Sequence, residues 1–264
     1  MSPTDSRSPA QIYEEDFVPA VFGPWGSTMS DLAGLTPGER VLDVACGTGA
    51  LTRVAAARVG PAGSITGLDA NPEMLEVAQR VAPGLEWRRG RAEALPFDDD
   101  NFDAVVSQFG FMFFDDQVGA LREMMRVLRP GGRLAVSVCD ALDHSPGYAV
   151  LTVLLQRLFG DEVARAFAAP FTSGDPRRLQ ELCRQAGIAS ARVQRVEGAV
   201  RFASVADLVS TERACAWTLG GLLDDDQFQL LLEHAEESLR PFVEADGRLN
   251  LSMPCLVITA ERPR

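Results

Sequence analysis

The sequence contains no lysine, because all 25 basic residues among its 264 residues are arginines. A P-loop lysine, a Schiff-base lysine and the ATP-binding lysine of protein kinases are therefore excluded. This absence argues against phosphoryl transfer and pyridoxal chemistry. Histidine and tyrosine are also scarce, with two residues of each against fourteen phenylalanines.

Cysteine is present in an odd number, five, with no C-x-x-C pair. This pattern supports neither a disulfide framework nor a zinc site, and we expect a protein of the reducing cytoplasm with no bound metal. No apolar run reaches the roughly 20 residues that a membrane span requires. Residues 1–10 are polar and lack the apolar core of a signal peptide, so we expect a loose tail there.

The balance of charge is acidic, with a formal net charge of -12. Nucleic-acid binding normally requires a basic face, so we expect no nucleic-acid partner. The length allows one large domain, or one domain with a modest second lobe, and a core of useful size without disulfides.

A strand, a glycine turn and a helix follow one another between residues 40 and 59. Residues 40–45 are mostly apolar, as in a buried parallel strand, and residues 50–59 carry apolar side chains at helical spacing. Between them, Gly47 and Gly49 allow a sharp turn and a close approach to a ligand. This order is that of the first unit of a nucleotide-binding α/β domain.

A second strand, residues 64–69, ends on Asp69, about 20 residues beyond the glycines. Asn71 then provides a helix cap and Pro72 the favoured first helical position. An acid at this place binds the ribose hydroxyls in adenosine sites. The alternative is an acid that only complements the helix dipole. The buried stripe of the helix is predicted to be Met74, Leu75, Ala78 and Val81.

Strands and helices continue to alternate along the chain, which predicts a parallel, doubly wound sheet. Further strands are expected at residues 85–89, 102–107, 133–138, 188–200 and 254–260. Further helices are expected as two short ones within 11–34 and around 121–128, 150–159, 175–186 and 204–240. The run Arg129-Pro-Gly-Gly132 reads as a helix stop signal.

The order of the predicted strands and helices divides the chain into four parts. The expected parts are a helical flap at 1–34, a Rossmann-like core at 35–140, a helical cap at 141–172, and the rest of the core sheet at 173–264 with a helical insertion at 204–245. The flap could cover the sheet edge, contact a ligand, or do both.

Four stretches in the same order resemble class I S-adenosylmethionine-dependent methyltransferases, most closely the ubiquinone/menaquinone C-methyltransferase-like group. They are VLDVACGTG at 41–49, GLDANPEML at 67–75, AEALPF at 92–97 with FD at 102–103, and RVLRPGG at 126–132. The resemblance implies an α/β, Rossmann-like sheet of seven mostly parallel strands with the last one antiparallel. It also implies S-adenosylmethionine as cofactor and S-adenosylhomocysteine as product.

By this resemblance, ten positions correspond to cofactor contacts. They are Asp43, Ala45, Gly47, Gly49, Asp69, Ala70, Met74, Arg91, Ala92 and Gln108. The glycine-loop backbone would hold the methionine part, Asp69 the ribose, and Met74 the adenine, with Gln108 near the methionine end. Arg91 departs from the family, which usually has Asp or Asn there, so the side-chain contact to the adenine edge is in doubt.

The methyl acceptor is less well defined. Methyl transfer is an in-line displacement that depends on positioning, and a base is needed only if the acceptor must lose a proton. His144 and Tyr13 are the candidate bases, with a solvated loop histidine as the plain alternative for His144. Four phenylalanines could line an apolar acceptor pocket or simply pack in the core. They are Phe109, Phe111, Phe113 and Phe114.

We therefore expect O- or C-methylation of a small apolar, aromatic or polyketide-like acceptor, as in secondary metabolism. Two other functions stay open. A nicotinamide-dependent oxidoreductase would share the first unit, although Thr52 replaces its third glycine. A relative that binds the cofactor without transferring methyl groups would share the whole fold, because function lies in the site.

Overall fold

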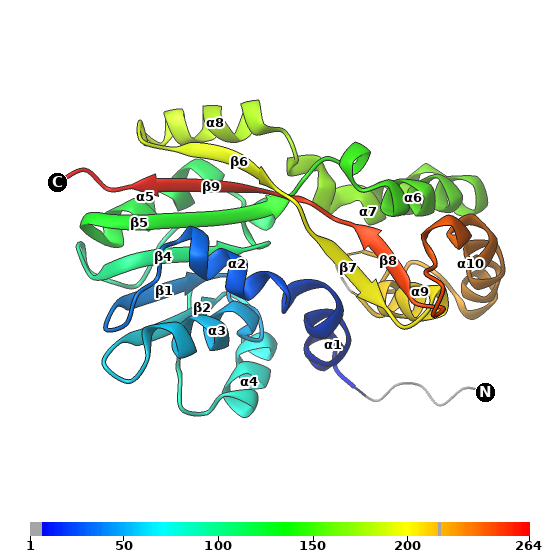
Figure 1. The fold of residues 1–264 in the computed structure, drawn as a ribbon, viewed down its shortest axis with the longest axis horizontal. Helices are drawn as coiled ribbons and strands as arrows, with labels where there is room; N and C mark the ends of the chain where they lie inside the picture. The colour runs from blue at the N-terminus through cyan, green and yellow to red at the C-terminus, as the bar shows by residue number, and fades with distance from the viewer. Residues whose placement is uncertain (1–6, 216–217) are drawn as a thin grey trace. The chain divides into compact units, whose positions relative to one another are not determined.

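The structure is a computed structural model that describes residues 7–215 and 218–264 (Figure 1). The chain divides into two compact units. The sheet unit consists of Phe22–Asp140, Ser173–Val196 and Cys255–Arg264, and the helical unit of Met1–Val21, Ala141–Thr172 and Glu197–Pro254. The predicted flap and insertion include residues 1–6 and 216–217, and these lie outside the described residues.

A seven-stranded sheet forms the centre of the sheet unit, in the order β3-β2-β1-β4-β5-β9-β6. Its strands are β1 (Arg40–Val44), β2 (Ser64–Asp69), β3 (Glu86–Arg89), β4 (Phe102–Gln108), β5 (Leu128–Cys139), β6 (Arg192–Val196) and β9 (Cys255–Glu261). β1 to β5 pair in parallel, whereas β9 pairs antiparallel with both β5 and β6. The predicted fold class is therefore confirmed.

Helices cover the sheet because each has one apolar side. They are α2 (Trp25–Leu32), α3 (Ala50–Val59), α4 (Pro72–Val81), α5 (Gln117–Val127) and α8 (Pro176–Gln185). In α4 the buried residues are Met74, Val77 and Ala78, whereas Val81 is 43% exposed. The predicted stripe was wrong at Leu75, which is only partly buried, and at Val81, which is the last residue of the helix.

Two strand boundaries differ from the prediction. β5 begins at Leu128, which pairs with Phe102 across a register shift, so the supposed stop signal lies inside the strand. Gly131, at φ 77°, gives the backbone the freedom for this irregularity. The single strand expected at 188–200 is two strands, β6 and β7 (Ala199–Phe202), which belong to different sheets.

The helical unit contains the remaining elements. They are α1 (Pro9–Ile12), the π-helix Tyr13–Phe22 up to Val21, α6 (Pro146–Phe159), α7 (Asp161–Ala168), α9 (Val205–Ala214), α10 (Asp225–Ser238), and a two-stranded ribbon of β7 with β8 (Leu249–Ser252). Two short helices were expected within 11–34, and Pro19 lies inside the π-helix, whose widened turns accommodate a residue without an N–H. Among the described residues, no helix is long and apolar enough to cross a membrane.

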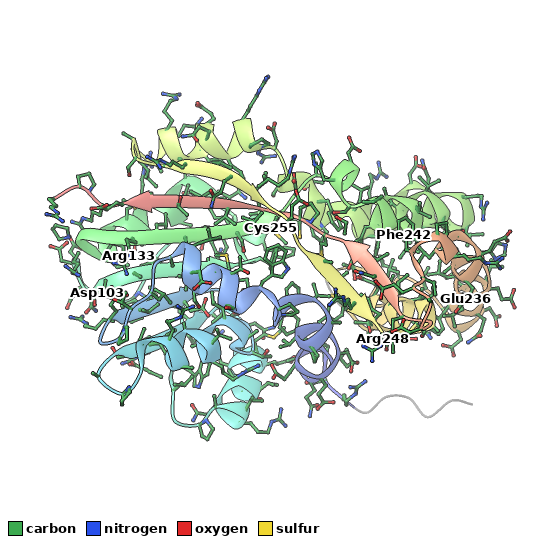
Figure 2. All side chains as sticks on the ribbon, viewed as in Figure 1. Asp103, Arg133, Glu236, Phe242, Arg248 and Cys255 are labelled. Atoms are coloured by element: carbon green, nitrogen blue, oxygen red, sulfur yellow. The ribbon has the colours of Figure 1, made fainter. Side chains whose placement is uncertain are left out.

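The interior of the helical unit is aromatic and closely packed. Tyr148 stacks on Phe167 and contacts Phe171, with ring centroids 5.9 and 5.1 Å apart. α6 also lies close to β8, since a Cβ at Gly147 would be 2.4 Å from Leu251 Cδ2. Figure 2 shows this density of side chains in the helical unit, where Glu236, Phe242 and Arg248 are labelled.

Ion pairs tie the sheet unit together where β1, β4 and β5 begin. Arg133 Nη2 lies 2.6 Å from a carboxylate oxygen of Glu39, and Asp103 accepts a hydrogen bond from the Arg40 N–H at 2.7 Å (Figure 2). These charges lie at the amino ends of the strands. Open α/β sheets bind ligands at the opposite ends of the strands, the carboxyl ends.

Candidate functional site

A left-handed glycine loop connects β1 to α3. Positive φ angles occur at Ala45 (58°), Gly47 (57°) and Gly49 (87°). Glycine adopts this conformation at little cost, but alanine does so at roughly 1–2 kcal/mol. The strain at Ala45 is held by its surroundings, because a Cβ at Gly110 would meet the Ala45 Cβ at 2.5 Å. The end of β4 therefore packs tightly against this loop.

The Trp87 indole covers the loop from the side of β3. A Cβ at Gly49 would come within 2.3 Å of the ring, and one at Gly67 within 2.5 Å. Trp87 Nε1 donates to the Ala82 carbonyl at 3.1 Å, which fixes the ring. The Trp87 ring thus leaves no room for a side chain at either glycine, and the positive φ of Gly49 is a second reason for glycine there. No sequence motif predicts this role of Trp87.

A buried carboxyl group, Asp43, lies directly below the loop. Its Oδ2 accepts a hydrogen bond of 2.6 Å from the Thr52 hydroxyl, and its Oδ1 has no partner among the described residues. Burial raises the pKa of Asp43 to about 7, the Thr52 bond opposes this, and the charge of Asp69 adds to it. Thr52, which replaces the third glycine, therefore has a definite role as the support of Asp43.

Asp69 connects the loop to the end of β2. Its two oxygens accept from the backbone N–H groups of Gly47 and Asn71, each at 2.8 Å. Burial raises the pKa of Asp69, and backbone bonds from Asn71, Gly47 and Ala70 counteract the rise. Each carboxylate oxygen has a second lone pair, so the group can accept two further hydrogen bonds from a ligand.

The residues predicted at the adenine edge lie after β2 and β3. Met74 and Ala92 are both buried. Arg91 is exposed and forms ion pairs with Asp115 and, at 3.4 Å, with Glu93. Its side chain is therefore engaged by two acids, Glu93 and Asp115.

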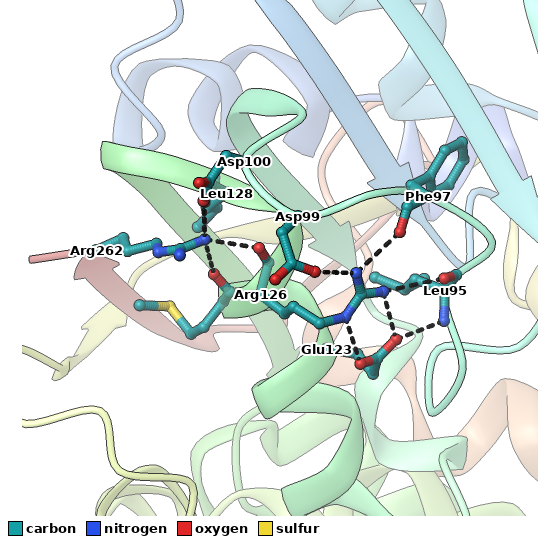
Figure 3. Close-up of polar contacts among 9 residues, drawn as sticks. Leu95, Phe97, Asp99, Asp100, Glu123, Arg126, Leu128 and Arg262 are labelled. Carbon is teal, nitrogen blue, oxygen red and sulfur yellow. Dashed lines mark hydrogen bonds and ion pairs between the residues drawn. The ribbon is translucent and has the colours of Figure 1, made fainter.

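Arg126 fixes the loop that follows Ala92 (Figure 3). It donates to the carbonyl groups of Leu95 and Phe97 and to the carboxylates of Asp99 and Glu123. Glu123 in turn accepts from the Leu95 N–H at 2.8 Å. The hydrogen bond from Arg126 lowers the pKa of Glu123. The loop beside Ala92 is thereby held in one conformation.

At the end of β4, polar atoms lie among aromatic rings. Gln108 Nε2 donates to the Phe22 carbonyl at 2.9 Å. Phe109, at φ 54°, lies between the rings of Phe22 and Trp25, with both centroids 5.7 Å away. Gln108 Oε1 and Trp25 Nε1 are buried and have no partner among the described residues. The end of β4 thus combines aromatic ring contacts with buried polar atoms.

The structure brings all ten predicted cofactor residues into the sheet unit. The two candidate bases belong to the helical unit, where Tyr13 stacks on Phe17 at 6.3 Å and His144 ends a single turn, Leu142–His144. The four phenylalanines do not form one surface. Phe111 is fully buried in the core, with Phe114 packed edge-on against it, whereas Phe113 is 49% exposed.

Comparison with known proteins agrees with this geometry. Residues 42–136 match the family described as methyltransferase domain. The ubiquinone/menaquinone biosynthesis C-methyltransferase of Ectopseudomonas mendocina is 44% identical over 118 residues, which cover 42% of this chain and 46% of that protein. The chain thus spans about half the length of the curated relatives it matches.

Two solved structures show the same fold over nearly the whole chain. A SAM-dependent methyltransferase from Aquifex aeolicus has a TM-score of 0.55 at 15% identity and covers 97% of this chain and 100% of its own. A phosphoethanolamine N-methyltransferase of Haemonchus contortus, in complex with S-adenosylhomocysteine, has a TM-score of 0.62 at 14% identity, over 97% of this chain and 58% of its own. Residues 42–136 are therefore similar to the methyltransferase-domain family, and the chain shares its fold with these solved methyltransferase structures.

Proposed function

We propose that the protein is an S-adenosylmethionine-dependent methyltransferase that acts on a small molecule. The observation that carries the proposal is the carboxylate of Asp69, which the Gly47 and Asn71 N–H groups hold at the end of β2 with lone pairs to spare. A fixed acceptor at this position suits the two hydroxyls of a ribose. The fit requires no phosphate-binding lysine, because this cofactor contains no phosphate.

The residues of the sheet unit fit an adenosine-containing cofactor. Asp69 would accept from the ribose, Met74 would lie against the adenine, and the Ala92 N–H would face the ring edge. The loop backbone at Ala45, Gly47 and Gly49 would hold the methionine part, with Asp43, Ala70 and Gln108 around it. The bound cofactor supplies an electrophilic methyl group, and the residues of this chain orient it and keep water away. Arg91 has no part in this fit, since its side chain pairs with Asp115.

For the acceptor we propose a small apolar or aromatic molecule, methylated on oxygen or carbon. The name of the Ectopseudomonas mendocina relative points to carbon methylation in quinone biosynthesis, but the 118 matched residues cover only 42% of this chain. The helical unit, which lies outside the matched family domain, is the proposed source of acceptor specificity. His144 and Tyr13 remain the proposed bases, should the acceptor have to lose a proton.

Calorimetric titration with S-adenosylmethionine, S-adenosylhomocysteine and NAD tests the cofactor. We expect micromolar binding of the first two and none of NAD. Asp69→Ala should weaken binding by about tenfold or more, because charged hydrogen bonds contribute roughly 1.5–3 kcal/mol each. Asp98→Ala, at an exposed turn residue, is the matched control. Unchanged affinity in a folded Asp69→Ala variant would contradict the assignment.

Transfer of a radiolabelled methyl group to a panel of phenols, quinones and apolar alcohols tests the reaction. Label in an extracted product supports methyl transfer. Tight cofactor binding without transfer to any compound of the panel would favour the alternative, a relative that binds the cofactor and does not transfer its methyl group.

A further inference from the structure

One edge of the sheet unit carries a concentration of arginines. α8 lies beside β6, the edge strand, and Gln180 Nε2 joins the two elements by donating to the Ala191 carbonyl at 3.2 Å (Figure 1). Residues 176–196 contain five arginines and one acid, a net charge of +4 in a chain whose net charge is -12. The five are Arg177, Arg178, Arg184, Arg192 and Arg195. This edge is therefore a basic surface on an acidic protein.

Two of these arginines form a basic ridge on the outer side of α8. The buried residues of this helix are Leu179 and Cys183. Arg177, Glu181 and Arg184 recur at steps of four and three residues on the opposite side. The two arginines of the ridge are exposed and lie two turns apart, about 10 Å along the helix axis. Glu181, between them, is already paired with Arg184 Nη2 at 2.6 Å.

An acidic ridge lies on α10, in the helical unit. This helix contains five acidic residues and no arginine, and its buried residues are Leu231 and Ala235. Asp226, Leu230 and Glu233 recur at steps of four and three residues on the opposite side. Both acids are exposed, and the apolar Leu230 between them is 38% exposed. The two acids are therefore as far apart along α10 as the two arginines of the basic ridge are along α8.

The size and surroundings of the basic ridge decide what it fits. α8 has ten residues and is therefore about 15 Å long. An extended polyanion such as a nucleic acid or an anionic membrane would also meet the rest of the surface, which is strongly acidic and repels it. A single acidic helix meets the basic ridge alone. The acidic ridge of α10 is such a helix face, with its charges at the matching spacing.

We propose that α8 of one copy of this chain docks against α10 of a second copy. Arg177 and Arg184 pair with Asp226 and Glu233, and the apolar stems of the arginine side chains cover Leu230. Because the two surfaces differ, each added copy leaves one α8 and one α10 free, so the assembly grows head to tail into a chain or a ring. Exposed ion pairs are individually weak and are screened by salt, so this self-association is weak and salt-dependent. The inference does not depend on the proposed function.

Analytical ultracentrifugation of the full chain at about 0.1 mM protein tests the contact, in about 0.02 M and about 0.5 M salt. We expect assemblies larger than a dimer at low salt and a monomer at high salt. Arg177→Gln combined with Arg184→Gln removes the charges of the basic ridge, and the dissociation constant should rise about tenfold or more. Asp226→Asn combined with Glu233→Gln removes those of the acidic ridge and should have the same effect.

A mixture of the two double variants gives the sharpest result. Each variant keeps one intact ridge, so an equimolar mixture at low salt should form dimers and nothing larger. The matched control is Arg80→Gln combined with Arg165→Gln, which removes two exposed arginines of other helices and changes the net charge equally. This control should assemble as the wild type does. All substitutions are at exposed positions, and circular dichroism checks that each variant is folded.

Three outcomes would overturn the proposal. They are a wild type that stays monomeric at low salt, assembly that neither double variant weakens, and a mixture of the two variants that stays monomeric. Binding of a monomeric wild type to phosphatidylglycerol vesicles, lost in the basic-ridge variant, would also overturn it and assign the basic ridge to an anionic surface. None of these results affects the cofactor titrations that test the proposed function.

Discussion

The two units each bury a carboxyl group with one oxygen that has no partner among the described residues, but the backbone around the two groups differs. Asp43 in the sheet unit receives a hydrogen bond from Thr52 and lies below a strained loop. Glu212 in the helical unit is 3% exposed, and its Oε2 has no partner among the described residues. Burial raises the pKa of each to about 7, with Thr218 opposing the rise at Glu212.

The same contrast appears in the backbone. All three non-glycine residues with positive φ among the described residues, Ala45, Asp100 and Phe109, belong to the sheet unit. Two of them lie at the ends of β1 and β4, beside the proposed cofactor. Strain of this kind persists where the surroundings over-determine the conformation, and it concentrates at binding sites. The sheet unit thus differs from the helical unit in holding strained backbone at the ends of β1 and β4.

The largest effect is expected for Asp43→Asn. Because the folded-state pKa of Asp43 lies above its ordinary 3.8, the neutral carboxyl stabilises the fold at low pH, and this contribution is lost as the pH rises through about 7. Asparagine cannot ionise, so the variant should gain up to about 4 kcal/mol over wild type at pH 8. Urea unfolding at pH 5 and pH 8 measures this, with exposed Asp98→Asn as control. A difference independent of pH would contradict the buried, titrating carboxyl.

Glu212→Gln should behave in the same direction with a smaller effect. The folded-state pKa is again raised, from 4.5 to about 7, so stability is present below the lower value and lost above the higher one. The expected gain at pH 8 is up to about 3 kcal/mol. Exposed Glu236→Gln on α10 is the matched control. The affinity of Glu212→Gln for S-adenosylhomocysteine should equal that of the wild type. A large change would mean that Glu212, like Asp43, affects the proposed cofactor site.

Two glycines test whether the sheet unit is the more rigid one. A Cβ at Gly67 would meet the Trp87 ring at 2.5 Å, and one at Gly147 would meet Leu251 Cδ2 at 2.4 Å. An aromatic ring cannot yield as a leucine methyl can, so Gly67→Ala should cost about 2 kcal/mol and Gly147→Ala less than about 1. Adding Trp87→Leu should recover part of the Gly67→Ala loss. Equal losses for both glycines in urea unfolding would show that the units do not differ in this respect.

The smallest effect is expected for Ala45→Gly. Glycine adopts the positive φ of 58° without the strain that alanine carries. It also increases the conformational entropy of the unfolded chain, so the net gain in unfolding free energy should be about 0.5–1 kcal/mol. Thermal denaturation detects such a gain. A loss of stability would mean that the Ala45 methyl contributes more through its contact at Gly110 than the strain costs.

The sheet unit could be predicted from sequence because each of its elements carries a local signal. The strand before the glycines, the Asn71 cap and the acid at residue 69 all depend on neighbouring residues. Trp87 and Thr52 could not be assigned, because their contacts are with partners on other elements. Thr52 does have one local signal. It places a hydroxyl in the first turn of the helix that follows the strand carrying the buried acid Asp43.

The helical unit was less predictable for a physical reason. Gly198 was treated as part of one strand, yet β6 and β7 on its two sides belong to different sheets. β8 escaped prediction because Leu249–Ser252 is only four residues long. Glu212 had no motif around it, and its burial follows from the packing of α9 against α10 and α1.

The position of β9 has a consequence for the order of folding. This strand lies between β5 and β6, and it is synthesised after both. Until it emerges, β5 and β6 each present an unpaired edge, and the sheet cannot close on that side. Residues Glu197–Pro254 of the helical unit are also made before β9 returns the chain to the sheet. A nascent chain released before Cys255 should therefore expose two strand edges and be prone to aggregation.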